Sequence, residues 1–171
     1  WAALKHAYSY IQGTTHWSLS SQMHADRTKY AFYTDSDHAG NRESQNKCKS
    51  QLGRIMFLND APIYWKTTTF SMATTSPLVT ETLPSISVGE AETSAYTGGV
   101  MDFMHMTYII GELNITPPPH PMLVHTDSTV AIAFAGNTAL KTTMKHMDLR
   151  QHWVRIVRDL SIAKPTHSKS D

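Results

Sequence analysis

The sequence predicts a mixed α/β domain in which three antiparallel strands come first and helices then alternate with strands. Residues 28–35, 51–58 and 62–66 are rich in aromatic and β-branched side chains, and turn residues separate the second run from the third. From about residue 89, apolar residues recur at helical spacing, interrupted by a short apolar strand. The 171 residues suit one domain with a real hydrophobic core.

Composition excludes several classes of protein. Hydrophobic residues make up 40% of the chain and charged residues 17%, which is typical of a globular protein and not of a disordered one. The single cysteine, Cys48, excludes an internal disulfide and favours a reducing compartment. No apolar run approaches the length of a membrane span, and we expect neither a signal peptide nor a membrane partner.

The stretch TKYAFYTDSDHAG, residues 28–40, is typical of a strand that ends in a carboxylate. Asp35 and Asp37 stand at and just past the expected strand end, before a turn at Ala39-Gly40. Because alternate strand positions point to one face, the two acids would share a face if the strand ran that far. An acid at a strand end can anchor a divalent metal ion. Turn-forming aspartates are also common there, and this stretch alone favours the turn.

The other elements before residue 88 follow from periodicity and turn signals. Apolar residues recur at helical spacing from Trp1 to Ile11, and Gly13 follows as a stop, which predicts a helix able to pack on a neighbour. Asn59-Asp60 predicts the turn of a hairpin. In order, we expect this helix, a connection over 14–27 with a possible strand at 17–19, the first strand, a loop over 41–50, the hairpin, and a long loop over 67–87.

A long helix is predicted over about residues 89–113. One stripe of this helix holds Glu92, Tyr96, Gly99, Phe103, Met106 and Ile110. Gly98-Gly99 weakens the helix by roughly 1 kcal/mol per glycine relative to alanine, and predicts a kink or a break. The remaining elements are a strand at 122–126, a helix at 128–135, a helix at 147–160 with Leu149, Trp153, Ile156, Val157 and Leu160 on one face, and a possible strand at 162–166.

Three acids have comparable placements in this scheme. Asp35 and Asp127 each end a strand within Thr-Asp-Ser, and Glu92 lies on the inner face of a helix. A helix packed across one edge of a sheet can bring such groups within a few ångströms. Close carboxylates repel each other, and a divalent cation normally stabilises the cluster. Oxygen-only ligation favours magnesium or manganese over zinc, and two such ions can hold both reacting oxygens of a phosphodiester displacement.

Other chemistries find less support in the sequence. The ten histidines and one cysteine do not have the spacing of a zinc site. There is no glycine-rich phosphate loop and no Gly-x-Ser-x-Gly motif. Cys48 lies between lysines in a polar stretch, which disfavours its use as a nucleophile beside a histidine.

Five segments in order, YTDSDHAG, SQLGRIMFLNDAPIYWK, GEAE, VHTDSTVAIAFA and KHMDLRQHWVR, together resemble the ribonuclease H domain of copia-type LTR retrotransposon Pol polyproteins. The first residues, WAALKHAYSYIQGT, look like the segment that joins the reverse transcriptase to that domain. The resemblance implies a ribonuclease H-like fold, a five-stranded mixed sheet with helices on its faces. It also implies a connection segment over 1–27 and the domain proper over 28–171.

The resemblance implies an endonuclease that cuts the RNA strand of RNA–DNA hybrids during reverse transcription. Its partners would be the hybrid and the reverse transcriptase domain of the same polyprotein, inside cytoplasmic retrotransposon particles. The family's first Asp falls on Asp35, its Glu on Glu92 rather than Glu90, and its next Asp on Asp127. These residues would bind two Mg²⁺ ions, for which Mn²⁺ can substitute, with Asp35 bridging both ions and a metal activating the water. Asp37 would be a turn residue or support a ligand.

The family reads the hybrid through groove shape and 2′-hydroxyls more than through base sequence. Basic residues also gather between 141 and 158, where acids are sparse. For each lysine or arginine taken singly, a solvated surface position is an equally good interpretation. The candidates for contact with the nucleic-acid backbone are Ser36, Lys66, Ser128, Lys145 and Arg150.

Three departures from the family keep alternatives open. The family's fourth acid follows the last strand, and Asp171 stands too early to match it, so we expect a domain truncated at its C-terminus. The segment between Trp65 and Glu90 is longer than the family's, and Gly98-Gly99 replaces helix formers. One alternative is therefore an inactive or incomplete module that binds nucleic acid or serves a structural role. Another is a different nuclease or transposase of the same fold.

Overall fold

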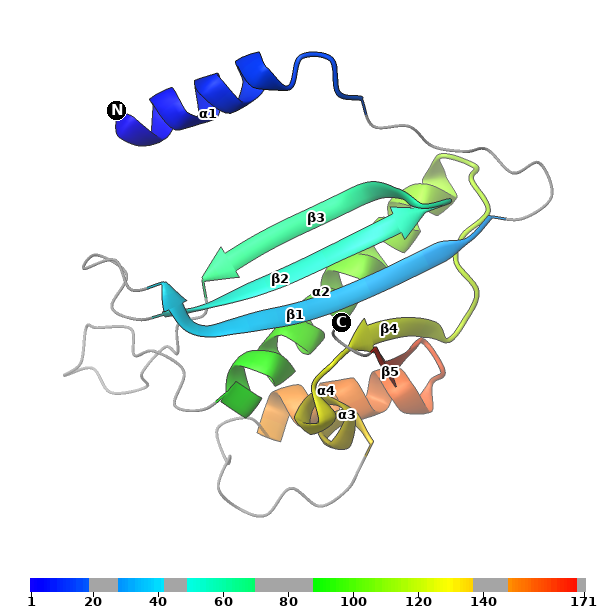
Figure 1. Ribbon diagram of the computed structural model, residues 1–171. Coiled ribbons are helices and arrows are strands. Elements are labelled where there is room, and N and C mark those ends of the chain that lie inside the picture. Colours follow the sequence, from blue (N-terminus) through cyan, green and yellow to red (C-terminus); the bar gives the residue numbers. More distant parts are fainter. Residues whose placement is uncertain (19–27, 42–48, 70–87, 137–147, 169–171) are drawn as a thin grey trace.

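A computed structural model describes residues 1–18, 28–41, 49–69, 88–136 and 148–168 (Figure 1). A five-stranded sheet lies at its centre, in the order β3-β2-β1-β4-β5. The strands are β1 (Tyr30–Asn41), β2 (Lys49–Leu58), β3 (Ala61–Thr69), β4 (Met122–Thr126) and β5 (Ala163–His167). The first three are antiparallel, whereas β4 is parallel to β1 and β5 is parallel to β4. The predicted mixed sheet is confirmed.

The β2–β3 hairpin turns at Asn59 and Asp60, as the sequence predicts. Both residues have positive φ, 49° and 65°, which is the conformation of a two-residue turn that matches the twist of the strands. Asn59 also connects the turn to the start of β1. Its backbone N–H donates to the Lys29 carbonyl at 2.9 Å, and its side-chain oxygen accepts from the Lys29 N–H at 2.9 Å.

Three helices share one hydrophobic core with one face of the sheet. The described helices are α1 (Ala2–Gly13), α2 (Val88–Glu112), α3 (Thr129–Ala135) and α4 (Asp148–Asp159). The sheet contributes Phe32, Met56 and Val124 to this core. Side chains at alternate positions of a strand point to the same face, so one face of the sheet supplies the core residues. Helix α2 crosses this face and α3 and α4 complete the layer (Figure 1). The core side chains from the helices are Tyr96, Val100, Phe103, Ile110, Ala131, Phe134, Ala135, Val154 and Val157.

Strand β1 is longer than the sequence predicts. It continues to Asn41, so Asp37 and Ala39-Gly40 lie in the strand and the predicted turn is wrong. The physical reason is pairing with β2, in which Asp35 faces Gly53 and Asp37 faces Gln51. Such ladder pairing outweighs local turn propensity. The predicted loops over 41–50 and 67–87 begin or end in strands, and their remaining residues lie outside the described ones.

Helix predictions hold for position and partly fail for packing. Helix α2 is one continuous element through Gly98-Gly99, so the predicted break is wrong. On α4, Val157 is buried as expected, but Ile156 and Leu160 are exposed and Val154 takes their place in the core. Helix α1 forms as predicted, yet none of its side chains is buried among the described residues. Residues 17 and 18 are not in a strand.

No helix in the described part of the chain is both long enough and apolar enough to cross a membrane.

Candidate metal centre

The parallel pairing of β1 and β4 brings two of the predicted acids to the same place. Tyr33 pairs with His125 across these strands. Asp35 and Asp127 each stand two residues further along, so they continue the same register, with Asp127 directly after β4. Because neighbouring strands lie about 5 Å apart, this register alone places the two carboxylates side by side.

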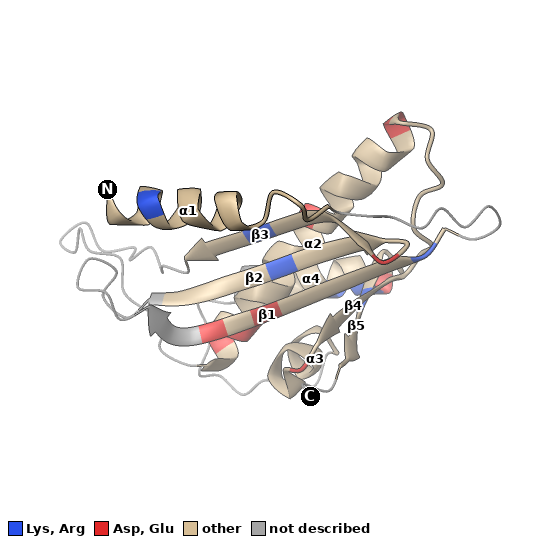
Figure 2. Ribbon diagram, turned by 45° about the horizontal axis from the view of Figure 1, so that its top comes forward, with Lys and Arg blue, Asp and Glu red and all other residues tan. Residues whose placement is uncertain are grey.

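Glu92 reaches the same point from α2. The acidic positions of β1 and of the start of α2 gather at one end of the sheet (Figure 2). Asp35, Glu92 and Asp127 each offer one carboxylate oxygen, and these atoms all lie within 4.8 Å of one another. Asp35 and Asp127 are exposed, whereas the Glu92 side chain is buried. All three predicted acids are thus brought together, while Asp37 and Glu90 do not belong to the cluster.

The electrostatics of the cluster suit a divalent cation. Burial raises the pKa of Glu92, the nearby Ser36 hydroxyl opposes this rise, and the charges of Asp127 and Asp35 raise the pKa further. Glu92 Oε2 is buried and has no hydrogen-bond partner among the described residues. Three close carboxylates, one with an unsatisfied oxygen, are hard oxygen ligands of the kind that Mg²⁺ or Mn²⁺ prefers. The cluster could therefore hold a metal ion.

The residues predicted to contact nucleic acid lie in varied environments. The Ser36 hydroxyl is buried beside the Glu92 carboxylate, whose pKa it lowers. Ser128 caps α3, where its Oγ accepts from the Ala131 N–H at 3.1 Å. Lys66 Nζ lies 3.5 Å from Asp102 Oδ2, with its side chain half exposed. Lys145 lies outside the described residues, and Arg150 belongs to α4.

Sequence reasoning missed an ion pair that connects α2 to the sheet. Arg54 Nε on β2 lies 2.7 Å from Asp102 Oδ2 on α2, and the Arg54 side chain is only 8% exposed. Arg54 Nη2 also donates to Thr68 Oγ1 at 3.2 Å. Burial, together with the hydrogen bond to Asp102, raises the pKa of Tyr64 to about 12. A buried arginine opposite a helical aspartate leaves no periodic signal, so only the fold reveals it.

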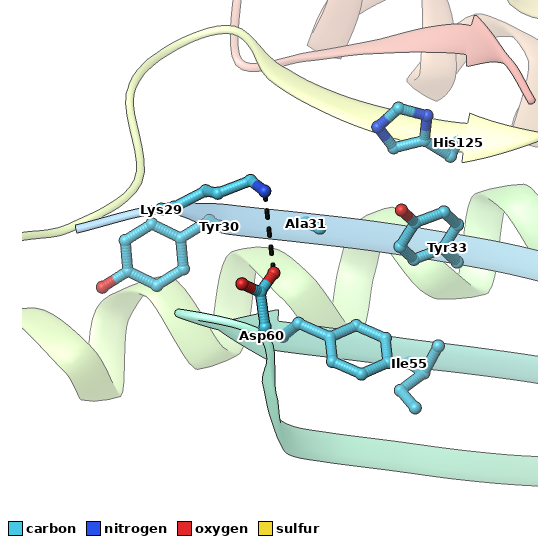
Figure 3. A pocket seen from close by; sticks show the side chains of 8 residues that line it. Lys29, Tyr30, Ala31, Tyr33, Ile55, Asp60 and His125 are labelled. Carbon is cyan, nitrogen blue, oxygen red and sulfur yellow. Dashed lines mark ion pairs between the residues drawn. The ribbon is translucent and has the colours of Figure 1, made fainter. Parts of the chain in front are cut away.

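An aromatic hollow lies on the other face of the sheet, next to the acids. The Tyr33 and His125 rings stack there with centroids 4.9 Å apart, each two residues before Asp35 or Asp127. The hollow has a volume of about 640 Å³. Figure 3 shows the two rings side by side and Lys29 reaching over β1 to Asp60, at 3.6 Å. No residue predicted as a site residue lines it.

Known proteins share the fold of this chain and, distantly, its sequence. No protein-family model matches the chain. The Retrovirus-related Pol polyprotein from transposon TNT 1-94 of Nicotiana tabacum is 28% identical over 159 residues, which are 93% of this chain and 11% of that protein. The chain thus spans about a tenth of this relative.

Two solved structures share the fold at low sequence identity. LC11-RNase H1, solved in complex with an RNA/DNA hybrid, superposes with a TM-score of 0.53 at 10% identity, over 82% of this chain and 85% of that one. The RNase H domain of prototype foamy virus gives a TM-score of 0.52 at 14% identity, over 85% and 82%. The chain therefore has a ribonuclease H-like fold and is distantly similar in sequence to the Pol polyprotein from transposon TNT 1-94.

Proposed function

We propose that this chain is a Mg²⁺-dependent ribonuclease H, which hydrolyses the RNA strand of RNA–DNA hybrids during retrotransposon reverse transcription. The observation that carries the proposal is the meeting of Asp35, Glu92 and Asp127 within 4.8 Å on a ribonuclease H-like fold. A structural neighbour of that fold has been solved with an RNA/DNA hybrid. In the distant relative the corresponding sequence lies within a retrovirus-related Pol polyprotein.

Each acid has a distinct part in this proposal. Asp35 is exposed within β1 and Asp127 is exposed directly after the adjacent strand β4, where a nucleic-acid backbone can approach from solvent. Glu92 is buried below them and would complete the ligand set with its unpartnered oxygen. Two bound ions would supply an activated water and neutralise charge at the phosphate. The protein would then need no nucleophile of its own, and its residues would hold the ions and orient the strand.

The context of the domain is part of the same proposal. Residues 1–27 would connect to a reverse transcriptase domain of the same polyprotein, and 28–171 would form the ribonuclease H domain. Two features support this division: α1 buries none of its side chains, whereas the whole sheet and core lie between residues 30 and 167. The domain would work inside cytoplasmic retrotransposon particles, with the hybrid as its substrate.

The test is cleavage of a hybrid with a labelled RNA strand in Mg²⁺. It should use residues 1–171 and a version extended along the parent reading frame, because the resemblance places a fourth acid after the last strand. Asp35→Asn should abolish cleavage of the RNA strand by whichever version is active. Asp60→Asn is the matched control, because Asp60 is exposed at a turn at the other end of β1, and asparagine tolerates its positive φ.

The outcomes separate the candidate functions. Cleavage of the hybrid that Asp35→Asn removes and Asp60→Asn keeps supports the proposal. Hybrid binding without cleavage by either version, unchanged by Asp35→Asn, overturns catalysis and favours a nucleic-acid-binding module. Cleavage of duplex DNA in place of the hybrid would indicate a different nuclease of this fold.

A further inference from the structure

Helix α2 approaches β1 closely at Gly99. A Cβ atom built on Gly99 would overlap the Cγ2 methyl of Thr34, and would lie 3.6 Å from Thr34 Cβ and 3.4 Å from Phe103 Cε2. Gly99 and Thr34 are both buried. The helix backbone therefore rests directly on a strand side chain, and any side chain larger than hydrogen at position 99 has to push α2 away from β1 or displace that methyl.

This contact adjoins one of the clustered acids in sequence and stands about two helical turns from another. Thr34 immediately precedes Asp35 on β1. Glu92 lies seven residues before Gly99, which is about two helical turns, so both residues stand on the same side of α2. A change in the separation at Gly99 therefore changes how far Glu92 stands from Asp35.

We propose that Gly99 and Thr34 are positioning residues, a small helix residue fitted to a branched strand residue that together hold Glu92 within reach of Asp35 and Asp127. The inference rests on the proposed metal site, because it concerns the distance at which the three ligands meet. It also explains why glycine stands at a position in α2 where helix propensity disfavours it. The glycines weaken α2 locally, but they allow a helix-to-sheet distance that brings the buried acid into the cluster.

Of the other glycines of α2, Gly111 provides the matched comparison. A Cβ on Gly98 would overlap the end of the Arg54 side chain, which is buried and held by Asp102 and Thr68, so alanine at position 98 would also disturb that ion pair. A Cβ on Gly111 would meet nothing within 4 Å. Replacing Gly111 by alanine therefore tests the change in helix propensity alone, and replacing Gly99 tests propensity and separation together.

The experiment is a size exchange between positions 99 and 34. The variants are Gly99→Ala, Thr34→Ser, the double variant and Gly111→Ala, in the full chain. Serine at 34 removes the methyl that alanine at 99 would strike, yet keeps the buried hydroxyl, whose oxygen has no hydrogen-bond partner among the described residues. Calorimetric titration with Mg²⁺ and with Mn²⁺, in the absence of nucleic acid, measures the site directly.

Gly99→Ala should weaken Mg²⁺ binding by about 10-fold or more, the loss seen when groups that orient metal ligands are removed. The double variant should bind Mg²⁺ with an affinity within about threefold of the wild type. A remaining difference of this size is too small to come from a displaced ligand. Gly111→Ala should bind like the wild type. Rescue by Thr34→Ser traces the loss to this contact, and urea denaturation without metal shows whether Gly99→Ala is folded when its Mg²⁺ affinity is measured, which separates a displaced ligand from a loss of folded protein.

Two results would overturn the inference: normal Mg²⁺ affinity in Gly99→Ala, or no recovery in the double variant. If Gly99→Ala does not fold, the double variant provides the test: the inference requires that it folds and binds Mg²⁺ like the wild type, and failure of either overturns it. If the wild type itself binds no metal, the proposed metal site fails. The positioning claim is then judged by crystal structures, in which the Glu92 and Asp35 carboxylates must lie further apart in Gly99→Ala than in the double variant.

Discussion

The two halves of α2 differ in what they bury: the second half buries apolar side chains, whereas the first half buries mostly polar ones. From residue 101 onward the helix is ordinarily amphipathic, with Phe103 and Ile110 in the core and Met101 and Tyr108 exposed. Residues 90–97 are buried without exception. Five of these eight are polar: Glu90, Glu92, Thr93, Ser94 and Thr97. The second half stabilises the fold, whereas the first half carries groups that are costly to bury and that stabilise it less.

The buried polar groups differ in how they are satisfied. Thr93 Oγ1 donates to the Gly89 carbonyl at 2.8 Å, and Thr97 Oγ1 donates to the Thr93 carbonyl at 2.7 Å. These bonds keep the threonine hydroxyls paired within the helix itself. Glu92 differs from these threonines, because its Oε2 has no hydrogen-bond partner among the described residues. A buried carboxylate with an unsatisfied oxygen destabilises a fold, which is why this half of α2 holds the candidate metal ligand.

The largest expected effect on stability is at Phe103, in the second half. Its ring is fully buried, 5.1 Å from the ring of Phe32 and 6.5 Å from that of Tyr64. Phe103→Ala should lower the free energy of unfolding by about 3–5 kcal/mol, because it leaves a cavity between helix and sheet. Urea denaturation measures this. Tyr108→Ala is the control on the same helix, exposed and expected to change stability by less than about 0.5 kcal/mol. Equal losses would contradict the amphipathic packing of this half of α2.

Glu92→Gln should show the reverse pattern, a loss of metal binding with little loss of stability. Removing one of three ligand charges should weaken Mg²⁺ binding by about 100-fold, or about 2.7 kcal/mol. Without metal at neutral pH, the neutral side chain should leave the free energy of unfolding unchanged or raise it, since a desolvated charge is removed. Calorimetric titration and urea denaturation give the two values. Glu112→Gln, exposed at the far end of α2, should alter neither, and wild-type Mg²⁺ affinity in Glu92→Gln would refute the ligand assignment.

The free energy of unfolding should also depend on pH through Glu92, with a smaller change than the loss of Mg²⁺ binding. The pKa of Glu92 is raised above its ordinary value of 4.5, chiefly by burial, so the folded protein holds this proton more tightly than the unfolded chain does. This contribution to stability is complete below the ordinary value, and is lost as pH rises through the raised pKa. Urea denaturation in a chelator should show a decline with pH that Glu92→Gln reduces. Mg²⁺ should restore stability on the high-pH side, and identical profiles for the two proteins would exclude Glu92 as the cause.

Much of the fold could be predicted because its signals are local. Strand β4 begins and ends where the apolar run MLVHT does, and the turn at Asn59 and Asp60 forms as its residues indicate. The failures arise where a distant segment decides. Asp37 lies in a strand because β2 pairs with it, and Ile156 is exposed because α4 turns Val154 towards the core. Neither outcome is encoded within a few residues of the position concerned.

The candidate site divides in the same way. Asp35 and Asp127 could be placed together from two strand ends, and Glu92 was named through the resemblance and its place on an apolar stripe. What could not be predicted is the separation between α2 and β1. Gly98-Gly99 marks this contact in the sequence, but helix propensity alone predicts only a weak point in the helix there. The contact with Thr34 shows that the helix backbone lies directly against the sheet at Gly99.

The smallest expected effect is at Gly111, and it separates intrinsic propensity from packing. Gly111 is exposed near the end of α2, where a Cβ would meet nothing within 4 Å. Its φ is not positive, so alanine fits the backbone. Gly111→Ala should therefore raise the free energy of unfolding by roughly 0.5–1 kcal/mol, as alanine has the lower entropy cost in a helix. Thermal denaturation measures this. The same substitution at Gly99 should instead destabilise, and an equal gain at both positions would mean that α2 does not rest on Thr34 at all.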